Sequence, residues 1–136
     1  MKILNTRYGN GASVVVRAIY ERHFEDTSHG FHPNRSCHTA LRDIKATFKG
    51  TRWFIEGDIK GFFDNIDHNI MIDILRERIS DERFLRLIRK FLNAGYMEKW
   101  TYNNTYSKTP QGGIISPILA NIYLDKFDKY IKEYAD

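Results

Sequence analysis

Apolar residues recur at helical spacing in five stretches of the chain. The first two run from Ser13 to Phe24 and from Ser36, a candidate N-cap, to Lys49. Asp67 and Ser80 are each candidate caps of a further apolar stripe, which predicts helices over residues 67–79 and 80–94. The last predicted helix begins at Ser116, with a proline at its first helical position.

Two other regions have the pattern of β-structure. Residues 52–58 (RWFIEGD) are short, aromatic and apolar at the centre, and end in Gly-Asp, which is typical of a strand. Residues 97–102 and 105–108 flank Asn103-Asn104, a two-residue hairpin signal. The predicted order is therefore α-α-β-α-α-β-β-α, an α+β fold without the βαβ run of a Rossmann sheet.

Composition narrows the class of protein. Apolar residues make up 42% of the 136 residues and aromatic residues 14%, which indicates a folded chain. No apolar run approaches the roughly 18 residues of a membrane span, and residues 1–10 hold no signal-peptide core, so we expect a cytoplasmic protein. The single Cys37 excludes an internal disulfide framework. A net charge of +4 permits a polyanionic partner.

Asp58 stands where the strand predicted over residues 52–58 ends. A carboxylate there, beside a free backbone carbonyl, supplies the hard oxygen ligands that Mg²⁺ prefers. Asp64 and Asp67 follow, but a turn residue and a helix cap account for these two without a metal. One carboxylate does not make a metal site, so the remaining chemistry has to come from its surroundings.

Two loops and one helix face carry other candidate chemistry. In residues 109–117 a glutamine and a Gly-Gly pair precede a capped helix. The glycines leave room for close approach by a ligand, or the segment is an ordinary entry into a helix. Arg35 precedes a helix and suits a phosphate, or is a solvated surface arginine. A third candidate is the basic helix face that consists of Arg83, Arg86 and Lys90. This face can follow a phosphate backbone, or it is only the solvent-exposed side of a helix.

Three segments in combination resemble the reverse transcriptases of group II intron maturases. Residues 28–41 (SHGFHPNRSCHTAL) resemble that family's second motif block. Residues 53–68 (WFIEGDIKGFFDNIDH) resemble the third block, and residues 109–130 (TPQGGIISPILANIYLDKFDKY) resemble the fourth. The resemblance covers the chain from about Val14 to its end, and three motifs in this order are specific where each alone is weak.

The resemblance implies part of a right-hand polymerase, with helices packed on a small antiparallel sheet. We expect a loose lead over residues 1–13, a fingers remnant over 14–51 and a palm portion over 52–136, without thumb and maturase domains. In such enzymes two Mg²⁺ ions activate the primer hydroxyl and stabilise the leaving pyrophosphate. The implied partners are an RNA template and intron RNA, a DNA primer and a dNTP, with no membrane.

The resemblance also implies roles for individual residues. Asp58 matches the first metal-binding aspartate, and the backbone carbonyl of Ile59 matches an additional metal ligand. Phe63 matches the aromatic steric gate beneath the sugar 2′ position, which fits DNA synthesis because a bulky ring collides with a ribose hydroxyl. The other matched positions face the nucleotide or the template–primer, and they are Arg35, Gln111, Gly112 and Gly113.

The sequence departs from the family pattern in three places. The family's Tyr-Ala-Asp-Asp hairpin is missing, and the similar letters at 134–136 continue a charged helix, so we interpret them as coincidence. The fingers strands that normally precede residue 14 are absent or replaced. His32 stands where the family usually has arginine, which weakens phosphate contact in that loop.

The sequence therefore predicts a fragment of an RNA-directed DNA polymerase of group II intron type. The family function is RNA-templated DNA synthesis, with intron mobility and splicing assistance. With Asp58 as its one matched carboxylate, the chain alone is predicted to be inactive. The alternative is a non-catalytic RNA-binding remnant, and a nucleotide cyclase is disfavoured because its acidic signature is absent. An unpaired strand edge over residues 53–57 also leads us to expect self-association.

Overall fold

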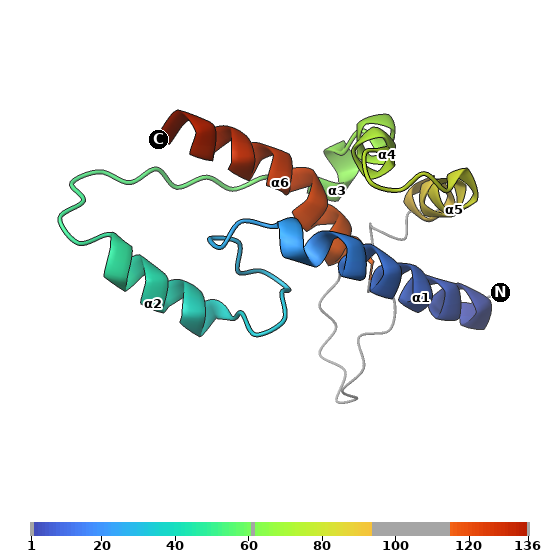
Figure 1. Cartoon of the computed structure of the whole chain (residues 1–136), viewed down its shortest axis with the longest axis horizontal. Helices are drawn as coiled ribbons and strands as arrows, with labels where there is room; N and C mark the ends of the chain where they lie inside the picture. Colours follow the sequence, from blue (N-terminus) through green and yellow to red (C-terminus); the bar gives the residue numbers. More distant parts are fainter. Residues whose placement is uncertain (1, 61, 94–114, 136) are drawn as a thin grey trace.

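The computed structural model describes residues 2–60, 62–93 and 115–135 (Figure 1), without the side chains of residues 2–9, 63, 64 and 135. Regular structure in these ranges is entirely helical. The helices are α1 (Lys2–Tyr20), the 3-10 helix η1 (Glu21–His23), α2 (Cys37–Thr47), α3 (Phe62–Asn65), α4 (His68–Arg76), α5 (Glu82–Asn93) and α6 (Ser116–Ala135). None of them combines the length and the apolar character that a membrane crossing requires.

The predicted α+β fold is wrong for the described part of the chain, which contains no strand and no sheet. Residues 52–58, predicted as a strand, are irregular, and Trp53, Phe54 and Ile55 are 87%, 76% and 100% exposed. A strand exists only through hydrogen bonds to a neighbouring strand, and no described segment supplies that neighbour. The hairpin predicted over residues 97–108 lies outside the described residues.

Four helices enclose the hydrophobic core. Helix α6 packs on α1 and α4, and α4 packs on α5 (Figure 1). The largest fully buried apolar side chains come from all four helices: Val16, Met71, Ile72, Leu75, Leu85, Ile88, Ile118, Leu119 and Ile122. The Tyr20 hydroxyl at the end of α1 donates to the carbonyls of Ile74 and Leu75 on α4, at 3.2 and 3.3 Å. Its burial raises the pKa of Tyr20 to about 12, so this link stays protonated at neutral pH.

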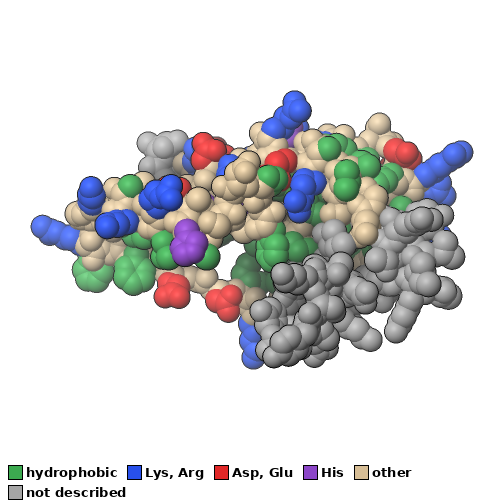
Figure 2. All heavy atoms as spheres, turned by 90° about the horizontal axis from the view of Figure 1, so that it is seen from below, with side chains coloured by type: hydrophobic (Ala, Val, Ile, Leu, Met, Phe, Trp, Pro, Cys, Tyr) green, Lys and Arg blue, Asp and Glu red, His purple; other side chains and the backbone are tan. Residues whose placement is uncertain are grey.

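Helix α2 lies apart from this core (Figure 1). Its predicted N-cap is confirmed, because the Ser36 side chain accepts from the Thr39 backbone and Thr39 caps Ser36 in return. Its apolar stripe, however, is exposed at Leu41, Ile44 and Phe48. Figure 2 shows hydrophobic side chains on the surface at this end of the molecule. No other described helix covers this face.

Helix boundaries differ from the predictions at both α1 and α5. Helix α1 begins at Lys2, so residues 2–12 are helical and not a loose lead. Helix α4 begins after Asp67, as predicted, and the Asp67 carboxylate accepts from two backbone N–H groups. Helix α5 begins after Asp81, whose Oδ1 accepts from the N–H groups of Arg83 and Phe84 at 2.8 and 3.2 Å. Asp81, and not Ser80, is therefore the cap.

The cap assignment of α5 gives a stability prediction. Replacing Asp81 by alanine is expected to lower the free energy of unfolding by about 0.5–2 kcal/mol, because two N–H groups lose their acceptor. The matched substitution Ser80→Ala is expected to change it by less than about 0.5 kcal/mol. Urea denaturation followed by circular dichroism measures both. A larger loss for Ser80→Ala would show that the serine caps the helix.

Candidate active site

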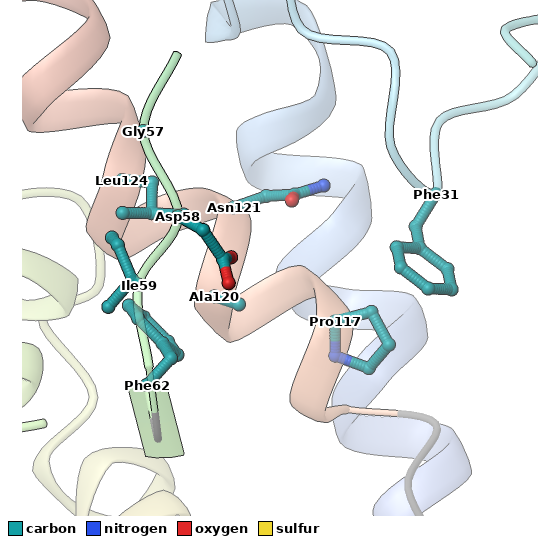
Figure 3. Close-up of a pocket in the computed structure, with 9 residues that line it drawn as sticks. All are labelled: Phe31, Gly57, Asp58, Ile59, Phe62, Pro117, Ala120, Asn121 and Leu124. Atoms are coloured by element: carbon teal, nitrogen blue, oxygen red, sulfur yellow. The ribbon is translucent and has the colours of Figure 1, made fainter. Parts of the chain in front are cut away.

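A cavity of about 450 Å³ lies between the first turns of α6 and the segment that leads into α3 (Figure 3). Its lining comes from three separate parts of the sequence, namely residues 28–41, 53–68 and 109–130. The lining residues are Phe31, Gly57, Asp58, Ile59, Phe62, Pro117, Ala120, Asn121 and Leu124. Tertiary structure thus brings together the three segments that the sequence analysis singled out.

Asp58 is the one carboxylate among the described residues that line this cavity. Figure 3 shows its side chain directed toward α6 near Ala120, with Ile59 beside it. A carboxylate and a backbone carbonyl are the ligand types that a divalent cation takes. Within the described residues, however, no group of three His, Cys, Asp or Glu side chains is placed to hold a metal ion. The described residues therefore match a metal site in ligand type but do not complete one.

Helix α6 presents one face to the cavity and the opposite face to the core. Pro117, Ala120 and Leu124 follow at intervals of three and four residues, which places them on one side of a helix. Leu119 and Ile122 on the other side are fully buried. The core packing of α6 therefore fixes the orientation of the cavity wall.

The loop before α2 supplies the far wall of the cavity. Phe31 and Asn34 both have a φ of 61°, a left-handed backbone conformation that costs a non-glycine residue on the order of 1–3 kcal/mol. The Arg35 guanidinium holds this loop, since it donates to the carbonyls of Glu25, at 2.7 Å, and Ser28. Arg35 does not line the cavity, and its predicted nucleotide contact stays a prediction.

His32, noted in the sequence as a departure from arginine, is an interior anchor of the same loop. Its side chain is 0% exposed, and its Nδ1 lies 2.9 Å from the Glu21 carboxylate. Its Nε2 lies 2.9 Å from the Ser28 hydroxyl, and its ring meets the Phe24 ring edge to face, with centroids 4.7 Å apart. The residue therefore holds the loop against η1.

Sequence reasoning missed Asn121 and Phe62. The Asn121 amide donates to the Gly30 carbonyl at 2.7 Å and lies 3.3 Å from His32 Nε2. Its only signal in the sequence is a polar residue within the apolar pattern of the last helix. Phe62 lines the cavity and meets Tyr123 edge to face at 5.8 Å, whereas the side chain of its neighbour Phe63 is not among those described. The steric-gate role of Phe63 stays a prediction.

The other predicted contact residues lie away from the described cavity wall. Gln111, Gly112 and Gly113 fall outside the described residues. The predicted basic face is exposed on α5 and does not line the cavity; it consists of Arg83, Arg86 and Lys90.

Comparison with known proteins places the chain in a family. Residues 3–136 match the family Reverse transcriptase (RNA-dependent DNA polymerase). The chain is 59% identical over 118 residues to the group II intron-encoded protein LtrA of Lactococcus lactis subsp. cremoris, a match that covers 87% of this chain and 20% of that protein. It is 55% identical over 119 residues to an uncharacterized 91 kDa protein in a cob intron of Schizosaccharomyces pombe, covering 88% and 15%.

A more distant relative is the mitochondrial nuclear intron maturase 1 of Arabidopsis thaliana, which is 33% identical over 79 residues, or 58% of this chain and 11% of that protein.

The match to LtrA covers 20% of the length of that protein, so the chain spans only a small part of this relative. Enzymes of the matched family bind an RNA template and use divalent metal ions. The family match covers nearly the whole chain, and its three motif segments converge on one cavity. The chain belongs to the reverse transcriptase family of RNA-directed DNA polymerases, in the group II intron-type branch.

Proposed function

We propose that this chain carries part of the nucleotide and metal site of a group II intron-type reverse transcriptase, with Asp58 as a ligand of Mg²⁺. The observation that supports this is the convergence of three motif segments on one cavity whose described lining holds a single carboxylate, Asp58. Mg²⁺ bound there would neutralise phosphate charge on an incoming dNTP. The chain's own contribution is to hold that carboxylate and the Ile59 carbonyl at the edge of an apolar cavity.

The remaining site residues are proposed from the resemblance of the three motif segments to the reverse transcriptase family. Phe63 excludes the ribose 2′ hydroxyl, and Arg35 and Gln111 contact the nucleotide together with Gly112. Gly113 faces the template–primer. Residues 14–51 belong to the fingers and residues 52–136 to the palm. The proposed substrates are an RNA template, a DNA primer and dNTPs, and intron RNA is the proposed partner in intron mobility and splicing.

Binding of Mn²⁺, a paramagnetic substitute for Mg²⁺, tests the role of Asp58. We expect Mn²⁺ to broaden the backbone amide signals of Gly57, Asp58 and Ala120 in a ¹⁵N-correlated NMR spectrum. Asp58→Asn removes the negative charge with almost no change of shape, so the broadening is expected to disappear.

A matched control comes from the same segment. Glu56 is exposed two positions before Asp58 and does not line the cavity. Glu56→Gln makes the same change of charge, and we expect it to leave the broadening intact. Broadening that persists in Asp58→Asn, or that is lost equally in Glu56→Gln, would contradict a metal role for Asp58.

A second proposed function is RNA binding through α5. Its apolar side chains Leu85 and Ile88 are buried against α4, so Arg83, Arg86 and Lys90 necessarily face solvent. These cations lie three and four positions apart and form a row along the helix. The nearest acid in the helix is Glu82, which pairs with Arg76 from α4 at 2.9 Å. The Arg76 pair neutralises that carboxylate and leaves the row basic, which favours a phosphate backbone.

A further inference from the structure

His32 is a buried titratable side chain for which the proposed metal and nucleotide site has no use. It lies in the loop between η1 and α2, and its side chain is 0% exposed. The Glu21 carboxylate lies 2.9 Å from its Nδ1, and the Ser28 hydroxyl lies 2.9 Å from its Nε2. The amide nitrogen of Asn121 lies 3.3 Å from the same Nε2. The ring therefore joins η1, the loop and α6.

The hydrogen-bond network assigns the tautomer of this ring. Asn121 Nδ2 donates to the Gly30 carbonyl at 2.7 Å, and reversing the amide would set two oxygens against each other. The second N–H of the same nitrogen is the donor to His32, whose Nε2 is therefore the acceptor. A neutral imidazole has one N–H, which then lies on Nδ1 and donates to Glu21.

A second proton on the ring changes Nε2 from an acceptor into a donor. The Ser28 hydroxyl can rotate to accept from it, because a hydroxyl both donates and accepts. The Asn121 amide cannot adapt in this way, because the Gly30 carbonyl fixes which end of the amide faces the loop. Two donors would then face each other at 3.3 Å. The hydrogen bond between His32 and α6 is therefore compatible only with the neutral ring.

The surroundings of His32 give a protonated ring a counter-charge. Among the described residues, Glu21 is the one charged side chain in hydrogen-bond contact with the ring. Its second oxygen, Oε2, is buried and has no hydrogen-bond partner in the described part of the chain. Charged groups on the neighbouring elements form ion pairs of their own, namely Arg35 with Asp26, His29 with Asp43, Lys129 with Asp125, and Lys132 with Glu25.

We propose that His32 is a pH-sensitive link between α6 and the cavity loop, residues 28–34. In its neutral form the ring accepts from Asn121 and holds the loop on the helix, and protonation of Nε2 breaks this link. Figure 3 shows Asn121 extending from α6 toward the loop that carries Phe31, and both residues line the Asp58 cavity. Protonation therefore loosens one wall of the cavity. This device does not depend on whether Asp58 binds a metal ion.

NMR of the complete ¹⁵N-labelled chain between about pH 8 and about pH 5, the range in which histidine ordinarily changes charge, tests the inference. Two-bond ¹H–¹⁵N spectra of the imidazole rings identify the tautomer. We expect the Nδ1–H tautomer of His32 at the upper end of the range. The side-chain amide signals of Asn121 should shift with the same midpoint as the His32 ring. In His32→Gln, which does not titrate, this pH dependence of Asn121 should be lost.

Asn121→Ala tests the link from the other side and remains informative if His32→Gln does not fold. Alanine fits the helix and removes the N–H that opposes a proton on Nε2. We expect the titration of the His32 ring to move upward by about 0.5–1 on the pH scale, the equivalent of roughly one hydrogen bond. An unchanged His32 titration in a folded Asn121→Ala variant would contradict the coupling.

Two other histidines provide matched controls. His29 belongs to the same loop and lies 3.2 Å from Asp43, whereas His68 is exposed on α4. In His29→Gln and His68→Gln the Asn121 signals should still follow the His32 ring. The inference is overturned by an Nε2–H tautomer, by a ring whose charge stays constant over the range, or by Asn121 signals that stay fixed while His32 titrates. Loss of the Asn121 response in His29→Gln would assign the switch to His29 and equally overturn it.

Discussion

Replacing Leu119 by alanine is expected to lower the free energy of unfolding by about 2–5 kcal/mol. Leu119 is 0% exposed on α6, the helix that packs on both α1 and α4. Removing its side chain loses buried apolar contacts and leaves a cavity that the surrounding helices fill only in part. Because α6 also carries Ala120 and Asn121, the same change is expected to weaken the wall of the Asp58 cavity.

Leu41→Ala is the matched comparison, since it is the same substitution in the apolar stripe of another helix. Leu41 is 63% exposed on α2, so we expect a change of less than about 0.5 kcal/mol. Urea denaturation at several protein concentrations measures both variants. Similar losses at the two positions, and dependence on concentration, would show that the α2 face is covered by a second copy of the chain. That outcome would support self-association through the apolar face of α2.

The triple substitution of Arg83, Arg86 and Lys90 by alanine is expected to reduce the salt dependence of RNA binding. Each phosphate contact of a cation releases counterions, and for a single strand this gives a slope of about −0.7 in log K against log salt. Loss of three contacts should therefore make the slope shallower by about 2. The cations project from α5 away from its buried face, so the fold itself is expected to persist.

Fluorescence anisotropy of a labelled single-stranded RNA over a series of salt concentrations measures the slope. A matched variant removes three exposed cations from α2 and the turn that follows it, namely Arg42, Lys45 and Lys49. If RNA binding reflects only the net charge of +4, the two triple variants will behave alike. If the row of cations on α5 contacts the phosphate backbone, only the α5 variant will have a shallower slope of log K against log salt. Identical behaviour would therefore remove the α5 face from the proposed RNA interface.

Local features of the sequence determined much of the helical structure. The caps at Ser36 and Asp67 were predictable because each requires only a side-chain oxygen close to the first N–H groups of its own helix. The family was also predictable, because three motifs in order are a property of the sequence itself. Asp58 was identified from the same motifs, and the structure places it in a cavity.

Interactions between distant segments decided the rest. Residues 52–58 have the composition of a strand, but a strand needs a hydrogen-bonded neighbour, and the described structure provides none. On α4, helical spacing groups Ile70 with Ile74, yet packing against α5 and α6 leaves Ile70 exposed and buries Ile74 together with Met71 and Ile72. The angle at which helices meet selects the buried face, and the sequence of one helix does not contain that angle.

The cavity wall is the clearest case of a feature that only tertiary structure decided. Asn121 lies far along the chain from Gly30, and their hydrogen bond joins α6 to the loop before α2. Nothing in the sequence of either residue indicates this contact, because an asparagine in a helix and a glycine in a loop are both common. The sequence by itself determined the family and the caps of α2 and α4, and it predicted Asp58 as a site residue. The packing of α6 on α1 and α4, and the hydrogen bond from Asn121 to the Gly30 carbonyl, decided which residues stand around Asp58, because these contacts bring α6 and the loop of Phe31 to the same cavity.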